Sequence, residues 1–416
     1  MKKLSMTLLT FALLFTTLLT NSVFAANNDS QSFEKRSTKY GNQIFVDASV
    51  LNLFHDNEEL TNHINTPGNS IVFYGVGLDK KSVYSNLFQG NKVPMILGAE
   101  EEYEKSNKGA KVLLPNDERE KIHPETGEPM EIEEGVLVQT DLTFYNYNGK
   151  IYVLDGSRYF PKNAKINVSE ESVENNSLRE QIINVRKKVE IEQFLDDINA
   201  QPQMSLQNND ATLMTSIRKS CWYYDDSLFY DLDTFEVGRT VTDYLIYNAQ
   251  NNDPDYDHLI IVADAQVYSV DDNRVLLGGF QGDFHKYYRE DDLISGQPDT
   301  TDIAQQLVKD RQLSFTIGLP KTASFTWAWN SGNSASMKAM ADKETGSYYD
   351  FIYGTSSSRY NTITGGGESV KVKYATMFKS LGTHLDVYIR SGISKQWFNE
   401  NTWKWHSYWE HLVYEY

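Results

Sequence analysis

The chain has 416 residues but only one cysteine, Cys221. A single cysteine excludes a disulfide bond within one molecule. Free cysteine behaves in most proteins as a small apolar side chain. We therefore expect Cys221 to be buried beside Trp222 rather than to act as a reactive thiol.

Positive charge is also scarce. The chain has 39 Lys and Arg against 57 Asp and Glu, which gives a formal net charge of −18. No cluster of basic residues stands out, so the balance argues against nucleic-acid binding. It also argues against long-range attraction to anionic lipid. Any membrane contact would depend on aromatic side chains or on a specific receptor.

Sequence motifs for catalysis or cofactor binding are missing. The chain has no Gly-x-Ser-x-Gly, no His-Glu-x-x-His and no supported Cys-His arrangement. Gly75-Val76-Gly77 lacks the third glycine of a dinucleotide loop, so we expect no nucleotide cofactor. Carboxylates and the histidines His285, His384, His406 and His411 leave a secreted hydrolase open as an alternative.

Long apolar runs occur only at the start of the chain. Met1-Lys2-Lys3 precedes the apolar run Leu8–Leu19, and Val23-Phe24-Ala25 suits a signal peptidase. We therefore predict a signal peptide over residues 1–25 and a secreted, extracellular protein. No later stretch approaches the roughly 20 apolar residues of a membrane-spanning helix.

The length and pattern of the remaining chain predict an α+β protein with two domains. We expect a small α/β domain over 41–198, a Gln/Asn/Ser-rich linker over 199–218 and a mainly antiparallel β-sandwich over 219–416. In the first domain, the apolar spacing predicts strands at 43–46 and 70–77 and helices at 57–64, 79–88 and 169–197. Asn148-Gly149 predicts a tight hairpin. In the second, strands are expected at 240–247, 258–268, 274–284, 370–378 and 385–393.

The stretch Leu313–Trp329 alternates apolar residues with Ser, Thr, Gly and Ala, which is typical of a strand with one apolar and one uncharged polar face. Leu313–Ser336 contains only Lys321 as a charge, and Tyr348–Thr364 contains only Asp350 and Arg359. Joined through 338–346, these runs predict a membrane hairpin over Ala323–Thr364. Its aromatic positions are Phe325, Trp327, Trp329, Tyr349, Phe351 and Tyr353.

Aromatic residues are concentrated near the C-terminus. Rings with an apolar body and a polar end favour membrane interfaces and carbohydrate surfaces. We therefore take five of them as candidate lipid or glycan contacts: Trp397, Trp403, Trp405, Tyr408 and Trp409. The alternative is a terminal strand pair with its rings packed inside the sandwich.

Three aspartates at alternating positions form a candidate metal site: Asp253, Asp255 and Asp257. A second, weaker candidate group is Asp225, Asp226, Asp231 and Asp233. Ca²⁺ takes several oxygen ligands, and such spacing supplies them. Pro254 interrupts the run, and the glycine and closing glutamate of a calcium loop are missing. An ordinary solvated turn is therefore the preferred interpretation, with no cofactor expected.

Together, the signal peptide, the lack of cysteine pairs, the β-rich second half, the uncharged hairpin and the Trp-rich end resemble secreted bacterial β-pore-forming toxins of the haemolysin and leukocidin kind. The resemblance implies a protein that acts on a host or neighbouring cell surface and inserts a hairpin as a homo-oligomer. A secreted adhesion module that binds carbohydrate or a receptor is the first alternative, and the unassigned hydrolase is the second.

Overall fold

The structure is a computed structural model of the chain. It describes residues 33–38, 41–48, 58–88, 96–98, 112–113, 131–133, 135–161, 211–226, 234–249, 257–270, 275–286, 288–289, 297–298, 312–317, 323–328, 335–342, 346–353, 363–364, 369–380, 384–397 and 403–415. The chain divides after Glu34, and the following concerns Lys35–Tyr416. The predicted signal peptide and the helix expected at 169–197 lie outside the described residues.

From β2 onward, the first described elements alternate strand and helix as the sequence predicted; β1, which precedes them, was not predicted. They are β1 (Glu34–Ser37), β2 (Asn42–Asp47), α2 (Glu58–Ile64), β3 (Ser70–Tyr74) and α3 (Lys80–Phe88). β2 and β3 pair in parallel, because α2 carries the chain back between them. Leu60 and Ile64 of α2 are buried. Tyr84 and Phe88 of α3 pack against the ring of Phe144.

The predicted Asn-Gly hairpin is confirmed. It joins β7 (Gly135–Tyr147) to β8 (Lys150–Pro161), with Tyr147 opposite Lys150. Asn148 has φ 53° and Gly149 has φ 83°. Both values lie in the left-handed region that a two-residue type I′ turn requires and that Asn and Gly tolerate best.

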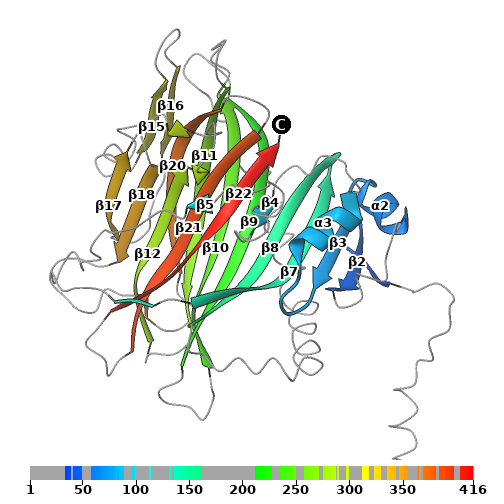
Figure 1. The fold of residues 1–416 in the computed structure, drawn as a ribbon, viewed down its shortest axis with the longest axis horizontal. Helices are drawn as coiled ribbons and strands as arrows, with labels where there is room; N and C mark the ends of the chain where they lie inside the picture. Colours follow the sequence, from blue (N-terminus) through cyan, green and yellow to red (C-terminus); the bar gives the residue numbers. More distant parts are fainter. Residues whose placement is uncertain are drawn as a thin grey trace, which may run out of the picture. The chain divides into compact units, whose positions relative to one another are not determined.

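A ten-stranded sheet, sheet A, runs through both halves of the chain in the order β1-β2-β3-β7-β8-β9-β10-β11-β20-β14 (Figure 1). Its later strands are β9 (Ala211–Asp226), β10 (Thr234–Ala249), β11 (Asp257–Ser269), β14 (Gln297–Pro298) and β20 (Ser369–Ser380). β9 to β20 are antiparallel neighbours, whereas β8 and β9 pair in parallel, with Asp155 opposite Lys219.

Part of the segment predicted as a linker at 199–218 is a strand. Strand β9 begins at Ala211, and its pairing with β8 places strands from both predicted domains in one sheet. The residues just before Ala211 are rich in Gln and Asn, which is typical of a linker. This composition concealed the start of strand β9 from the sequence analysis. The division into two domains stays a prediction about which segments fold independently.

A second sheet, sheet B, has the order β17-β18-β12-β21-β22-β4, with β19 beside β12 and β6 beside β22. Its strands are β4 (Ile96–Gly98), β6 (Glu131–Glu133), β12 (Val275–Lys286), β17 (Ala335–Asp342), β18 (Gly346–Tyr353), β19 (Ile363–Thr364), β21 (His384–Trp397) and β22 (Lys404–Glu415). Two short pairs complete the list: β5 (Val112–Leu113) with β13 (Tyr288–Arg289), and β15 (Gln312–Ile317) with β16 (Ala323–Ala328).

Sheets A and B pack face to face as a sandwich. The ring of Tyr244 on β10 meets Phe284 on β12, Tyr374 on β20 meets the same phenylalanine, and Tyr223 on β9 meets Tyr408 on β22. These rings are buried and form the core between the sheets. The predicted α+β class is confirmed, with long antiparallel strands and two short helices in the described part of the chain.

Candidate functional site

Four buried charged side chains meet where α3, sheet A and sheet B come together. Lys219 Nζ on β9 lies 2.6 Å from Asp155 Oδ1 on β8 and 2.9 Å from Glu410 Oε1 on β22. Lys80 Nζ on α3 lies 2.5 Å from Asp155 Oδ2 and 3.5 Å from Glu410 Oε1. We call these four residues the seam cluster, because they join a helix and two sheets.

Backbone geometry brings the cluster together. Asp155 and Lys219 are opposite each other in the parallel β8–β9 ladder, so they share one face of sheet A. Tyr159, four residues after Asp155 on the same face, packs against Tyr408 of sheet B. Glu410 follows Tyr408 by two residues and therefore projects from the same side of β22.

The two ammonium groups control the ionisation of Asp155. Burial opposes the charged form, but the charges of Lys219 and Lys80 outweigh it and lower the pKa of Asp155 to about 2. For Lys219, burial favours the neutral amine, yet Asp155 and Glu410 raise its pKa above the ordinary value. The cluster thus contains two acidic and two basic side chains, whose formal charges sum to zero.

A register shift in β7 places a hydrogen-bond donor beside the cluster. The β7–β8 register shifts between Gln139 and Asp141. There Gln139 Nε2 donates to Asp155 Oδ1 at 3.1 Å and to the carbonyl oxygens of Asp141 at 2.7 Å and Gly156 at 2.9 Å. A Cβ on Gly156 would overlap the carboxylate of Asp141, so a larger residue here would require the Asp141 side chain to move.

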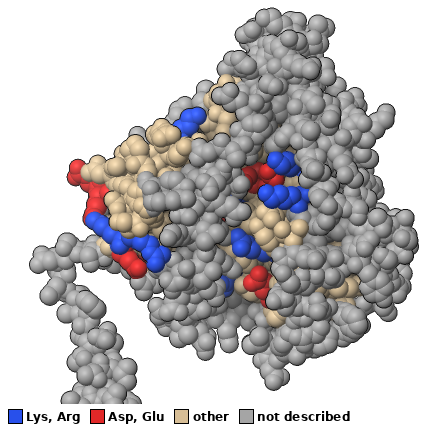
Figure 2. Space-filling view, turned by 180° about the vertical axis from the view of Figure 1, so that it is seen from behind, with Lys and Arg blue, Asp and Glu red and all other residues tan. Residues whose placement is uncertain are grey.

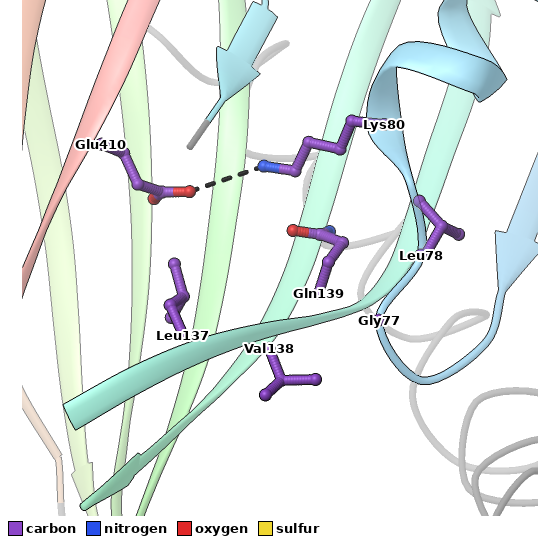
Figure 3. A pocket seen from close by; sticks show the side chains of 7 residues that line it. All are labelled: Gly77, Leu78, Lys80, Leu137, Val138, Gln139 and Glu410. Carbon is purple, nitrogen blue, oxygen red and sulfur yellow. Dashed lines mark hydrogen bonds and ion pairs between the residues drawn. The ribbon is translucent and has the colours of Figure 1, made fainter. Parts of the chain in front are cut away.

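A pocket of about 260 Å³ opens beside the seam cluster. Figure 3 shows Lys80 and Glu410 on one side of it and Leu137, Val138 and Gln139 on β7 along another. Gly77 and Leu78, which precede α3, complete the lining. Glu410 is 1 % exposed, and its second oxygen, Oε2, has no hydrogen-bond partner among the described residues.

The single thiol lies near this cluster but is not positioned to react. Cys221 is fully buried, and burial raises its pKa to about 12. Its sulfur contacts the carbonyl oxygen of Trp222 at 3.9 Å. The predicted burial of Cys221 beside Trp222 is confirmed. Reactive cysteines need a stabilised thiolate, and this environment disfavours one.

The predicted C-terminal contact residues divide into two groups. Trp397, Trp405 and Tyr408 are buried, and Trp397 Nε1 donates to Asp225 Oδ2 at 2.7 Å. These three side chains have no surface to offer a membrane or glycan in this conformation. Trp403 and Trp409 are half-buried. Their contact with lipid or glycan stays a prediction.

The predicted membrane hairpin is only partly paired as expected. β17 and β18 form an antiparallel hairpin with Asp342 opposite Gly346, inside the predicted connection 338–346. Tyr349, Phe351 and Tyr353 lie on β18, whereas Phe325 and Trp327 lie on β16. β16 pairs with β15 instead of with the chain after β18. Trp329 lies outside the described residues.

Of the candidate calcium ligands, Asp257 is exposed at the start of β11, and Asp253 and Asp255 lie outside the described residues. Within the described ranges, no group of three His, Cys, Asp or Glu side chains is arranged to hold a metal ion.

The histidines do not gather around the pocket. His285, His406 and His411 are buried elsewhere on sheet B, and His411 Nε2 lies 3.3 Å from Asp386 Oδ1. The side chain of His384 is outside the description.

Acidic and basic side chains are also paired at a second place on sheet A, on strands β9, β10, β11 and β20. Arg218 forms two hydrogen bonds with Asp243, at 2.6 and 2.7 Å, and Lys373 Nζ lies 2.6 Å from Asp264 Oδ2. Figure 2 shows acidic and basic side chains side by side in the described part of the face seen from behind. No patch of one sign appears on that face among the residues described there.

Comparison with known proteins gives little. No family model matches the chain, and no curated protein matches it. A solved structure described as "Pore forming protein" aligns with 50 % of this chain and 94 % of its own, at 9 % identity and a TM-score of 0.24. A TM-score this low does not establish a common fold.

Neither described helix is long and apolar enough to cross a bilayer.

Proposed function

We propose that the protein is secreted, acts at the surface of a host or neighbouring cell, and forms a pore by inserting the β17–β18 hairpin into the bilayer. The observation that carries this proposal is the place of the hairpin in sheet B. Among the described strands, β17 is the terminal strand of the sheet order, and β18 is joined to the rest of the sheet through β12. Seven residue pairs, from Gly279↔Ile352 to His285↔Gly346, form that connection.

The sequence of the hairpin suits a bilayer. Residues directly opposite each other share a face of a sheet. One set of opposite positions holds Ala335 and Tyr353, Met337 and Phe351, and Ala339 and Tyr349. The alternate set is mixed: it places Ser336 opposite Ile352, Lys338 opposite Asp350 and Met340 opposite Tyr348. One face is thus largely apolar and the other carries the charged residues of the two strands, and a strand that contacts lipid needs one apolar face.

Length also supports the proposal. Each strand has eight residues, against the roughly 9 to 11 of a tilted bilayer-spanning strand. The chain before β17 supplies the difference, since residues 323–337 contain no charged side chain. One hairpin in lipid leaves its outer backbone groups unpaired, so several copies must assemble around the pore. We therefore include a homo-oligomer in the proposal.

A reversible crosslink tests whether the hairpin must leave the sheet. Cysteines at Gln281 and Asp350, which are directly opposite on β12 and β18, would lock the hairpin when oxidised. The expected result is release of calcein from mixed-lipid liposomes by the reduced protein, loss of release on oxidation and recovery with dithiothreitol.

The matched control joins the two strands of the hairpin itself. Cysteines at Ser336 and Ile352 tie β17 to β18 but leave the β18–β12 connection free. The oxidised control should still release calcein. Equal release by both oxidised variants would rule out hairpin detachment. No release by wild-type protein from liposomes or erythrocytes, without detergent-resistant oligomers, would rule out the pore itself.

A further inference from the structure

The pocket beside the seam cluster contains an unsatisfied hydrogen-bond acceptor. Lys80 and Lys219 both contact Oε1 of Glu410. Oε2 of the same carboxylate is buried without a partner, and Figure 3 shows it turned toward Leu137 rather than Lys80. A buried polar atom that has lost water costs free energy until a donor reaches it. The pocket is the space from which a donor can come.

The charges of the cluster decide what kind of donor fits. Two ammonium groups already balance two carboxylates, so an added cation would lie unpaired close to Lys80 and Lys219. An anion would meet Glu410 itself. A neutral O–H group satisfies Oε2 without disturbing this balance. A ketone or an ether, which has no donor, cannot do so.

The residues that line the pocket limit the size and polarity of the rest of the ligand. Leu78, Leu137 and Val138 are the apolar residues of the lining, and Figure 3 shows the side chain of Leu137 on the same side of β7 as Glu410. The pocket volume is about 260 Å³. At a water-sized share of about 30 Å³ for each heavy atom, the space holds roughly eight of them. We propose that this pocket binds a neutral alcohol with a compact apolar body, whose hydroxyl donates to Glu410 Oε2. This site is independent of the pore proposal.

Three probes of nearly the same shape test the chemistry. Cyclohexanol carries the donor, cyclohexanone carries only an acceptor, and cyclohexylamine is a cation at neutral pH. Titrations followed by saturation-transfer NMR on the full mature chain should give cyclohexanol a dissociation constant at least tenfold lower than either analogue. Equal affinities for the three would overturn the proposal. Undetectable binding of cyclohexanol would also overturn the proposal and would indicate that the pocket holds only water.

Two substitutions on β7 locate the binding. Leu137 is half-buried at the pocket, so Leu137→Trp fills the space with little effect on the core and should abolish cyclohexanol binding. Val136, 49 % exposed and outside the pocket lining, gives the matched control Val136→Trp, which should bind as the wild type does. Retained binding in Leu137→Trp would place the ligand elsewhere. Glu410→Gln should remove the preference for alcohol over ketone, and if it fails to fold, the Leu137→Trp result decides.

Discussion

The carboxylate of Asp155 on β8 and the ammonium group of Lys219 on β9 face each other at 2.6 Å, at directly opposite positions of a parallel ladder. Both side chains are at most 2 % exposed. Neither charge can return to water without separating the strands. The pair therefore couples the ionisation of one carboxylate to the integrity of sheet A.

This coupling predicts an acid-dependent loss of stability. The pKa of Asp155 lies at about 2 in the folded protein, below its ordinary value of 3.8. A lowered folded-state pKa stabilises the protein above pH 4, and the contribution disappears as pH falls toward 2. The difference corresponds to about 2 kcal/mol. Urea unfolding between pH 5 and pH 2 should show a shallower pH dependence for Asp155→Asn than for wild type, whereas parallel profiles would contradict the assignment.

The two ion pairs Arg218–Asp243 and Lys373–Asp264 should differ in how much they stabilise the protein, because only the first pair is buried. Arg218 and Asp243 are buried, so Arg218→Ala leaves an unpaired carboxylate and should cost about 3–5 kcal/mol of unfolding free energy. Lys373 and Asp264 keep side-chain exposures of 20 % and 18 %, and Lys373→Ala should cost about 1 kcal/mol or less. Urea denaturation measures both. A similar loss for the two variants would mean that burial does not govern these pairs.

The contact between Gly282 and Tyr374 should tolerate no added atom. A Cβ on Gly282 would overlap the phenol ring of Tyr374, which is fully buried between the sheets. Gly282→Ala should therefore lower the free energy of unfolding by about 1–3 kcal/mol. In a Tyr374→Ala background the same change should cost much less, because the ring is gone. Additive losses in this double-mutant cycle would show that the ring is not the cause.

The thiol of Cys221 should resist modification while the protein is folded. Its pKa of about 12 leaves roughly one thiolate in ten thousand molecules at pH 8, and the sulfur is buried. The reagent DTNB should react fully within minutes in guanidinium chloride and very slowly under native conditions. Rapid reaction of the native protein would contradict the buried environment.

Local patterns in the sequence predicted the local structure well. The alternation of strands and helices up to Phe88 and the Asn148-Gly149 turn depend on neighbouring residues only. The strands predicted at 240–247 and 258–268, which correspond to β10 and β11, were found for the same reason. The β8–β9 pair was missed even though a helix was predicted at 169–197 between its strands, which is the connection that parallel strands need. The linker predicted at 199–218 assigned the two strands to different domains.

The seam cluster was missed for a related reason. Lys80 and Glu410 lie 330 residues apart, and no pattern within one segment reveals that they meet. A weak signal did exist. Asp155 follows the apolar run Ile151–Leu154 directly, and a charge inside such a strand needs a buried partner of opposite sign. The same limit applied to Trp397, Trp405 and Tyr408, whose residue types suit either a surface or a core.

The parallel pairing of β8 and β9 also bears on how the polypeptide could be divided. Seven opposite pairs, from Val153↔Ile217 to Tyr159↔Tyr223, and the ion pairs of the seam cluster join the chain before Pro161 to the chain after Ala211 without using the peptide bonds between them. Two polypeptides cut within that interval would each keep one strand of the ladder. We expect such fragments to recognise each other and rebuild the sheet, as the halves of a split reporter do.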